Sequence, residues 1–406
     1  MKTSLTTWSQ QATFGQEANQ ILRSCVHCGF CTAVCPTYQL LGNELDGPRG
    51  RIYLIKAVLE GHPVSTETQK HLDQCLTCRA CETACPSGVQ YGRLVDIGRG
   101  ILEQQVARSW VQKSLRWGLR NVLAQSPLFS RLLCVGQMAR PLLPAKLREQ
   151  IPPPVTLRRY PPVRHARKML ILEGCVQPAL APNINVATAH VLDKLGISLV
   201  RVPEAGCCGA LDYHLGAHVQ GLTRMRHLIE TWWPFVENGV EAIVITASGC
   251  GSLLKEYGHL LRNDPHYAEK AARISALTFD LSEILAQENL TVFLPEPKVT
   301  KTRIAVHVPC SLQHGQKLAG VLETLLSRLS YDLLPVADSH LCCGSAGTYA
   351  LLEKTISQQL LSNKLTALQA GQPECIVTAN IGCQMHLQSQ AHIPVKHWIE
   401  LLAERC

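Results

Sequence analysis

The sequence predicts a multidomain protein: an α-helical N-terminal domain, a basic connector, and a C-terminal α/β domain made of two related repeats. Three observations support this prediction. Two very similar cysteine runs lie within the first 86 residues, a strand-and-cysteine pattern occurs twice after residue 167, and the segment between them is rich in proline and arginine. A chain of 406 residues is long enough for two or three domains of about 150 residues each. We place the divisions at residues 1–107, 108–166, 167–296 and 297–406.

Composition limits the class of protein. The apolar content of 46% and the charged content of 17% are typical of a folded globular chain, and 19 cysteines are far more than packing requires. The first 16 residues lack the apolar core of a secretory signal, and apolar runs such as 169–172 and 242–245 are too short to span a bilayer. We therefore expect a soluble or peripheral cytoplasmic protein whose cysteines bind metal rather than form disulfides.

The N-terminal domain carries two cysteine runs of the ferredoxin type. Residues 25–36 and 75–86 both fit the pattern C-x₂-C-x₂-C-x₃-C-P, which is used to hold [4Fe–4S] clusters. The first three cysteines of a run bind one cluster from a tight turn, and the fourth points away and binds the other cluster. The expected ligands are Cys25, Cys28, Cys31 and Cys85 for cluster 1, and Cys75, Cys78, Cys81 and Cys35 for cluster 2.

Zinc is the alternative for paired cysteines, but a zinc ion takes four ligands, and two runs of four cysteines that each end in Cys-Pro do not match that need. The segment between the runs predicts a helix, because Pro48 suits a first turn and Ile52, Ile55 and Leu59 recur on one face. This arrangement resembles the helical ferredoxin domains of respiratory iron–sulfur subunits. We interpret His27, inside the first run, as a surface or packing residue rather than a ligand.

The second half of the chain is an internal repeat. In each copy a short apolar strand ends at a cysteine, a helix and a second strand follow, then a Cys-Cys-Gly segment, and then a third strand that ends at another cysteine. Strands alternating with helices predict two α/β lobes with parallel sheets, related by a pseudo-twofold axis, with the cysteines at the carboxyl ends of strands. The matching segments are 168–175 with 303–310, 191–200 with 325–334, 206–209 with 341–344, and 242–250 with 375–383.

The doubled pattern resembles the cysteine-rich Cys-Cys-Gly domain of heterodisulfide reductases and their relatives. Together with the ferredoxin runs, the whole chain resembles the family of iron–sulfur subunits of bacterial glycolate oxidase. The segments that carry this resemblance read HCGFCTAVCPTYQLLG, LDGPRGRIYLIK, CCGSAGTYALL and TANIGCQMHL. Related proteins are the iron–sulfur subunit of anaerobic glycerol-3-phosphate dehydrogenase and the iron–sulfur protein of L-lactate utilisation.

The chain departs from the family pattern at one point in each repeat. The family closes each repeat with C-x-x-C, but here Leu253 and His386 stand at the last position. Four cysteines per repeat still suffice for a further cluster, and His386 offers a nitrogen ligand; otherwise these residues are buried, inert thiols. The better candidates are Cys310, Cys342, Cys343, Cys383 and His386, followed by Cys175, Cys207, Cys208 and Cys250. Three further cysteines, Cys134, Cys375 and Cys406, are interpreted as structural.

No flavin or nicotinamide site is predicted, because no G-x-G-x-x-G opens a helix after a strand, and no catalytic motif is recognised. Oxidation of a 2-hydroxy acid needs such a cofactor. The resemblance therefore implies that FAD sits on partner subunits that oxidise glycolate and D-lactate, while this chain relays electrons through two [4Fe–4S] clusters, with a third an open question. The alternatives are the equivalent subunit for glycerol 3-phosphate or L-lactate, a disulfide-reducing subunit, and a redox sensor.

The connector carries most of the positive charge. Residues 108–168 contain thirteen lysines and arginines and one acidic residue, Glu149, a local charge of +12 in a chain whose net charge is +8. No nucleic-acid-binding motif accompanies them. Residues 108–123 predict a basic amphipathic helix, suited either to an anionic membrane or to a partner subunit. We expect peripheral association with the inner face of the cell membrane and a quinone acceptor. The apolar stripe comprises Val111, Leu115, Leu119 and Val122, and the charge Arg108, Lys113, Arg116 and Arg120.

Overall fold

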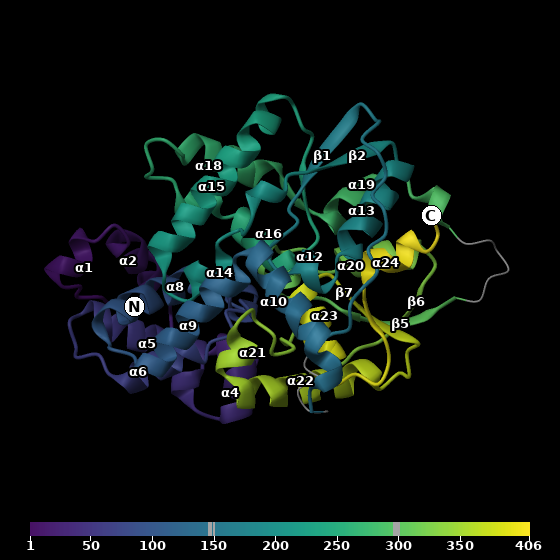
Figure 1. The fold of residues 1–406 in the computed structure, drawn as a ribbon. Helices are drawn as coiled ribbons and strands as arrows, with labels where there is room; N and C mark the ends of the chain where they lie inside the picture. Colours follow the sequence, from purple (N-terminus) through teal and green to yellow (C-terminus); the bar gives the residue numbers. More distant parts are fainter. Residues whose placement is uncertain (145–147, 149–150, 295–300) are drawn as a thin grey trace.

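The computed structural model describes residues 1–144, 148, 151–294 and 301–406 (Figure 1). Its N-terminal domain is entirely helical among these residues and packs around one apolar core. The elements of this domain are α1 (Thr7–Gln11), α2 (Gly15–Ser24), α3 (Phe30–Ala33), α4 (Pro36–Leu41), the 3-10 turn η1 (Glu44–Asp46), α5 (Pro48–Leu59), α6 (Thr66–Asp73), α7 (Ala80–Thr83) and α8 (Tyr91–Gln105).

Helix α5 is the helix predicted between the two cysteine runs. Pro48 stands in its first turn, and Ile52, Ile55 and Leu59 are buried on the face that meets α8. The two helices come very close at Gly98, where an added Cβ would lie 2.8 Å from Cγ1 of Ile55. A side chain at this position would separate α5 from α8, and these two helices carry Arg51, Ile52 and Tyr91, which lie beside the cysteines of the two runs.

The connector contains the helix predicted at residues 108–123 and a further helix after it, although its prolines are typical of extended and turn segments. It forms two helices, α9 (Trp110–Leu123) and α10 (Ser126–Ala139), and a 3-10 turn η2 (Arg140–Leu142). Pro127 does not break α10, because it occupies the first turn, where its missing N–H is not needed. Residues 145–147 and 149–150, which include Lys146 and Glu149 of the basic segment, lie outside the described residues.

The first lobe contains a four-stranded parallel sheet with strand order β2-β1-β3-β4. Its strands are β1 (Arg167–Ile171), β2 (Ile197–Arg201), β3 (Ile243–Ile245) and β4 (Thr278–Asp280). Its helices and 3-10 turns are α12 (Gln177–Leu180), α13 (Asn183–Lys194), η3 (Pro203–Ala205), α14 (Ala210–His214), α15 (His218–Glu237), α16 (Ser248–Leu254), α17 (Tyr257–Leu260), α18 (Ala268–Leu277), α19 (Leu281–Gln287) and η4 (Thr291–Phe293).

The second lobe repeats this topology, with strand order β6-β5-β7-β8, again all parallel. The repeat in the sequence is therefore a repeat of one α/β unit, as predicted. The expected boundary at residues 296 and 297 lies outside the part of the chain that is described. The strands are β5 (Arg303–His307), β6 (Asp332–Leu334), β7 (Cys375–Thr378) and β8 (Val395–His397). The helices are η5 (Ser311–Gly315, a π-helical turn), α20 (Val321–Arg328), α21 (Tyr349–Leu352), α22 (Lys354–Gln369), α23 (Ile381–Gln388) and α24 (Trp398–Ala403).

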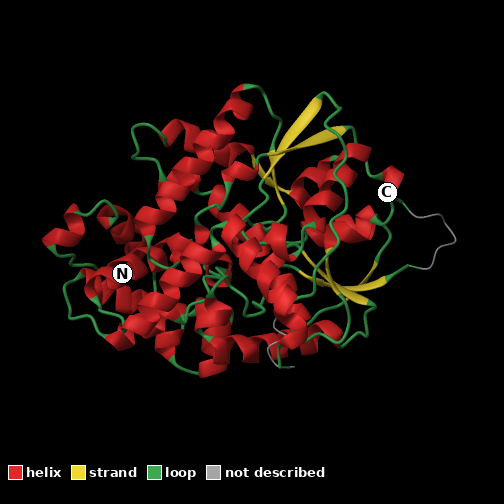
Figure 2. Ribbon diagram, viewed as in Figure 1, coloured by secondary structure: helices red, strands yellow, loops and turns green. Residues whose placement is uncertain are grey.

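The two lobes share one hydrophobic core. Figure 2 shows the two sheets facing each other with helices between them. Helix α13 of the first lobe packs on α24 of the second, and α19 packs on α20, so that one cluster of buried side chains extends from β1 to β7. Polar contacts also cross between the lobes: Nε2 of His397 lies 2.9 Å from the carbonyl oxygen of Thr246, and the N–H of Ser248 donates to the carbonyl of Ala379 (3.2 Å).

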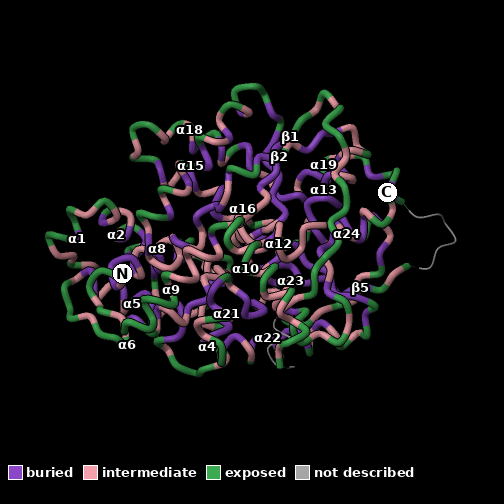
Figure 3. Tube along the Cα trace, in the orientation of Figure 1, coloured by how far each residue is buried: buried purple, intermediate pink, exposed green. Residues whose placement is uncertain are grey.

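The N-terminal domain lies against both lobes, and the most buried parts of the chain run through the middle of the molecule (Figure 3). Arg79 forms an ion pair with Glu256 of the first lobe at 2.5 Å. The hydroxyl of Tyr349, in the second lobe, donates to the carbonyl of Gln74 at 3.1 Å. No helix in the described part of the chain is both long enough and apolar enough to cross a bilayer.

The shared core leads to a prediction about stability. Leu322 on α20 is fully buried in it, so Leu322→Ala should lower the free energy of unfolding by about 2–5 kcal/mol. Because this core belongs to both lobes, urea unfolding should show one transition for Trp232 in the first lobe and Trp398 in the second. Val219→Ala, at an exposed site, is the control. A lower urea midpoint reported by Trp398 alone, with the transition at Trp232 unchanged, would contradict a common core.

Candidate metal centres

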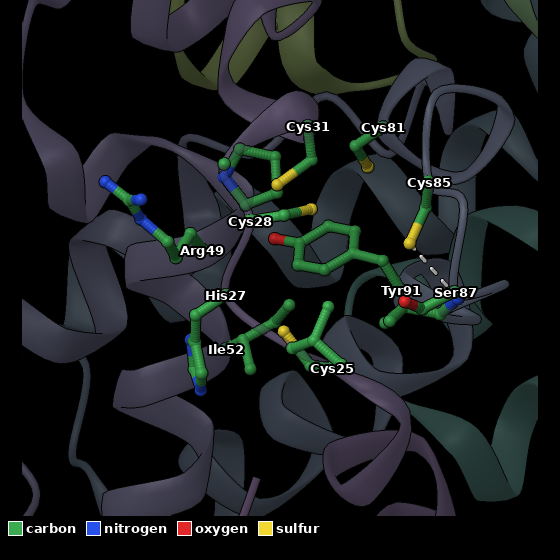
Figure 4. A pocket seen from close by; sticks show the side chains of 14 residues that line it. Cys25, His27, Cys28, Cys31, Arg49, Ile52, Cys81, Cys85, Ser87 and Tyr91 are labelled. Atoms are coloured by element: carbon green, nitrogen blue, oxygen red, sulfur yellow. Dashed lines mark hydrogen bonds between the residues drawn. The ribbon is translucent and has the colours of Figure 1, made fainter.

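Four of the predicted ligands surround one cavity in the N-terminal domain. Cys25, Cys28, Cys31 and Cys85 line it together with Tyr91 and Ile52 (Figure 4). Cys25 and Cys28 come from the loop before α3, Cys31 from α3 itself and Cys85 from the end of the second run, so the structure brings Cys85 together with residues 54 positions or more before it in the sequence. Cys81 also reaches the edge of this cavity.

The other four predicted ligands line a second cavity nearby. These residues are Cys35, Cys75, Cys78 and Cys81. Their sulfurs have polar neighbours: Oγ1 of Thr37 lies 3.3 Å from Sγ of Cys35, and the hydroxyl of Tyr91 lies 3.7 Å from Sγ of Cys75. Each cavity thus combines three cysteines of one run with the fourth cysteine of the other.

The two loops that hold these cysteines have the same backbone conformation. The third and fifth residues of each run lie in the left-handed region: His27 (φ 58°) and Gly29 (φ 86°) in the first, Thr77 (φ 52°) and Arg79 (φ 62°) in the second. Left-handed residues curl the chain tightly, and in the second loop the N–H of Thr77 donates to Sγ of Cys75 at 3.4 Å. His27 points away from the sulfurs and stacks on Tyr53, with ring centroids 4.6 Å apart, so it is a packing residue.

The chemistry of these sulfurs fits a metal cluster. Burial, together with the neighbouring Cys25, raises the pKa of the Cys31 thiol to about 11, and burial and nearby cysteines raise the pKa of Cys78 and Cys81 well above the usual range. Several thiolates this close together repel one another and lose their hydration. A positively charged group between them removes both penalties, and thiolate sulfur is the ligand that iron–sulfur clusters use.

Arg51 provides a fixed positive charge beside the second cavity. Its side chain is 1% exposed, donates from Nε to the carbonyl of His71 (2.7 Å) and from Nη1 to Oγ1 of Thr37 (3.1 Å). Burial opposes its charge, but Cys75 and Cys35 raise the pKa of the guanidinium, which therefore stays protonated. The guanidinium also pairs with the buried carboxylate of Asp46 at 3.6 Å, and as a cation shielded from solvent it would stabilise additional negative charge on a centre held by these cysteines.

The candidate cysteines of the second lobe also come together. The sulfurs of Cys310 and Cys342 lie 3.7 Å apart, and those of Cys343 and Cys383 lie within 4.8 Å of each other. The Cys-Cys-Gly segment requires its glycine, because Gly344 has φ +89° and an added Cβ would lie 2.6 Å from the carbonyl oxygen of Ser357. In the first lobe, Cys175, Cys207, Cys208 and Cys250 likewise line one cavity.

His386 lines the same cavity as Cys310, Cys342 and Cys383, but among the described residues it is not in the group of ligand atoms that lie within 4.8 Å of one another. Its Nε2 lies 3.2 Å from Oγ of Ser357. Instead His307, which sequence reasoning missed, has a ring nitrogen within 4.8 Å of the sulfurs of Cys343 and Cys383. Burial lowers the pKa of His307 to about 3, so its imidazole is neutral and able to bind metal. His307 is the last residue of β5, next to the carboxyl end of β7, where open α/β sheets place their site residues. That position could have identified it from the sequence.

A large cavity of about 1330 Å³ joins these sites. It lies where the N-terminal domain meets both lobes, and cysteines from all three parts of the chain line it: Cys75 and Cys78, Cys175, Cys207, Cys208 and Cys250, and Cys310, Cys342 and Cys383. Of the three cysteines interpreted as structural, Cys375 is buried in β7, whereas Cys134 and Cys406 are exposed.

The helical cysteine domain and the doubled α/β unit define a class of iron–sulfur protein. A family model described as "4Fe-4S dicluster domain" matches residues 21–89, and one described as "Cysteine-rich domain" matches residues 169–255 and 304–388. Iron–sulfur clusters are therefore the cofactors of this chain.

Known proteins then identify the family. The "Glycolate oxidase iron-sulfur subunit" of Escherichia coli (strain K12) is 55% identical over 100% of this chain and 99% of its own length. The "Probable glycolate oxidase iron-sulfur subunit" of Bacillus subtilis (strain 168) is 32% identical over 90% of this chain and 88% of its own length. "Lactate utilization protein A" of the same strain is 26% identical over 59% of this chain and its full length. The chain belongs to the family of glycolate oxidase iron–sulfur subunits.

The buried charge of Arg51 gives a testable consequence. Arg51→Gln should lower the reduction potential of a cluster held in the cavity that Cys35, Cys75, Cys78 and Cys81 line, by on the order of 100 mV for one charge at an effective dielectric constant of about 20. Redox titration followed by EPR measures this shift. Arg51→Lys keeps the charge and should move the potential less.

Arg49, which is 37% exposed near the other cavity, supplies a matched control, since solvent screens its charge. Arg49→Gln should leave both potentials nearly unchanged. An unchanged or higher potential in Arg51→Gln would show that the guanidinium does not act on the cluster.

Proposed function

We propose that this chain is the electron-transfer subunit of an FAD-linked glycolate dehydrogenase that also oxidises D-lactate, and that it passes electrons from a partner flavoprotein to the quinone pool. The observation that carries this proposal is the pair of adjacent cavities, each lined by the four cysteines predicted to share a cluster, in a chain 55% identical to a glycolate oxidase iron–sulfur subunit. Within this proposal the ligands are Cys25, Cys28, Cys31 and Cys85 for one cluster, and Cys35, Cys75, Cys78 and Cys81 for the other.

The division of labour follows from what each group can do. Removing a hydride from a 2-hydroxy acid needs a two-electron cofactor, which we place as FAD on the partner subunits. The clusters, when bound, supply one-electron transfer. The residues of this chain hold the clusters close together, exclude water from them through buried side chains such as Tyr91 and Leu94, and set their potentials through Arg51.

We also propose the domain organisation given above, with divisions at residues 1–107, 108–166, 167–296 and 297–406, and a pseudo-twofold relation between the lobes. The identical strand orders of the two sheets support this relation. Residues 108–142 form the helices α9 and α10, so the connector is a folded element rather than a simple tether.

The same proposal places the complex on the inner face of an anionic membrane, with α9 and α10 as the contact. Three arginines that the sequence offered for this contact point inward instead: Arg108 and Arg116 pair with Asp73, and Arg120 pairs with Asp212. The exposed residues of this segment are mostly apolar, and the exposed basic residues among them are Lys113 and Arg131. The exposed apolar residues are Trp110, Val111, Leu115, Trp117, Leu128, Leu132, Val135, Met138 and Leu142. Tryptophan flanked by basic residues suits a lipid interface.

The function is tested on the complex purified anaerobically with its flavoprotein subunits. Glycolate should reduce it and produce the EPR signals of two interacting [4Fe–4S] clusters, and D-lactate should do so as well. Cys31→Ser should remove one of the two signals and about four irons per chain. Cys134→Ser, at an exposed cysteine far from both ligand sets in the sequence, should change neither.

Reduction by glycerol 3-phosphate or L-lactate but not by glycolate would instead favour the alternative subunits. Failure to co-purify with any flavoprotein would contradict the proposal altogether.

The membrane contact is tested with vesicles that contain anionic lipid. The variant Trp110→Ser/Trp117→Ser should co-float with them several-fold less than the unmodified complex, because the two indoles are 78% and 63% exposed and supply apolar area to the interface. Val219→Ser, at an exposed apolar residue elsewhere, is the control. Unchanged flotation would refute the contact, and loss of the flavoprotein subunits would mean that these helices bind a partner instead.

A further inference from the structure

The two lobes share a framework but differ in the side chains around their cysteines. The correspondence between them follows from the strand register, because β1 pairs with β3 in the way that β5 pairs with β7. The corresponding pairs are Ile171–Val244 and Val306–Val377. The helices α15 and α22 correspond through the glycine of each Cys-Cys-Gly segment: a Cβ at Gly209 would meet the carbonyl of Gly221, and one at Gly344 would meet that of Ser357.

On this correspondence, four buried apolar positions of the first lobe are polar or charged in the second. Imidazole and ammonium groups are unfavourable in place of buried leucines unless they interact with something polar or charged. The first lobe has buried polar residues of its own, such as Gln177 and Thr246, but those two are hydrogen-bonded to each other, and it has no imidazole or ammonium group at these four positions. Leu172, Ile245, Leu253 and Leu228 in the first lobe correspond to His307, Thr378, His386 and Lys364 in the second.

His307 is the one of these residues that reaches the sulfurs. Its ligand nitrogen and the sulfurs of Cys343 and Cys383 all lie within 4.8 Å of one another, and all three residues are buried. Oγ1 of Thr378 lies 3.0 Å from Nδ1 of His307, which fixes the orientation of the ring. A hydrogen bond to one imidazole nitrogen is the usual way in which the other is aimed at a metal.

The donor set is too large for a single zinc ion. Cys310 and Cys342, with sulfurs 3.7 Å apart, adjoin the same group, so four sulfurs and one nitrogen are gathered where zinc takes four ligands. A cluster of several irons spreads its coordination over such a set. Lys364, 4% exposed, lies near these cysteines and donates from Nζ to the carbonyl of Asp338 (2.7 Å), so the second lobe also has a buried cation that offsets anionic charge.

We propose that the second lobe alone holds an additional iron–sulfur cluster, that His307 is its nitrogen ligand, and that the first lobe holds none. The proposal rests on the proposed function, in which the chain relays electrons. The site is placed to extend that relay: Cys78 of the N-terminal domain packs in one apolar cluster with Cys310 and Cys342. His386, hydrogen-bonded to Ser357, supports the site from outside and is not a ligand.

The test uses the whole complex, purified anaerobically, with iron and sulfide analysis and pulsed EPR for nitrogen coupled to the cluster. The unmodified complex should contain more than the roughly eight irons per chain that two [4Fe–4S] clusters supply. A strongly coupled nitrogen should be present in it and in His386→Leu, and absent in His307→Leu. Leu172 and Leu253 occupy the corresponding buried positions of the first lobe, so both leucine variants should fold.

Three further variants separate the two lobes and guard against a misfolded result. Cys343→Ser should reduce the iron content and Cys208→Ser should leave it unchanged. Thr378→Val places an apolar residue where the first lobe has Ile245. It should change the size of the nitrogen coupling without loss of iron, because the variant loses only the hydrogen bond that orients the His307 ring.

A nitrogen coupling that persists in His307→Leu, about eight irons in the unmodified complex, or iron lost from Cys208→Ser would each overturn the proposal. The signals of the two N-terminal clusters and their reduction by glycolate report separately on the proposed function. A complex that keeps those signals but shows any of these three results would refute the additional cluster alone.

Discussion

The structure depends on one electrostatic constraint: several cysteine sulfurs are buried close together, and they can ionise there only beside a positive charge. Desolvation and mutual repulsion keep the thiols of Cys31, Cys78 and Cys81 protonated when no such charge is present. The left-handed turns at His27 and Thr77, the buried guanidinium of Arg51 and the tight contact of α5 with α8 at Gly98 all serve to hold these sulfurs around a cavity. The N-terminal domain is therefore organised by its ligands as much as by its apolar core.

Much of this arrangement could be predicted because it depends on local patterns. The spacing within each cysteine run, the helix at residues 48–59 and the strands that end near Cys175 and Cys310 are set by neighbours in sequence. The repeat itself predicted two sheets of like topology. The site that sequence reasoning reached least well is in the second lobe, where His386 occupied the expected position and His307 did not. Which imidazole meets the sulfurs is decided by a pairing of β5 with β7, over 71 residues, and single-sequence patterns do not contain that information.

The connector also shows what the composition of a segment does not reveal about its structure. Its prolines suggested extended chain, but Pro127 stands where a helix tolerates proline, and the composition of a segment does not reveal that position. Its arginines suggested a basic surface, yet Asp73 and Asp212, distant in sequence, take up three of them. The net charge of the segment can be counted from the sequence. Whether each arginine faces solvent or an acidic side chain cannot, because that depends on residues distant in the sequence.

The exchange of the fourth cysteine between the two runs has a consequence for how the protein is made. If Cys85 completes the set begun by Cys25, and Cys35 joins Cys75, Cys78 and Cys81, the second set is complete only when a nascent chain has emerged past residue 81, and the first only when it has emerged past residue 85. The first run, although synthesised 50 residues earlier, must wait as reduced thiols. Cluster insertion is then a single late event in biosynthesis, and a chain truncated between the runs could retain neither cluster.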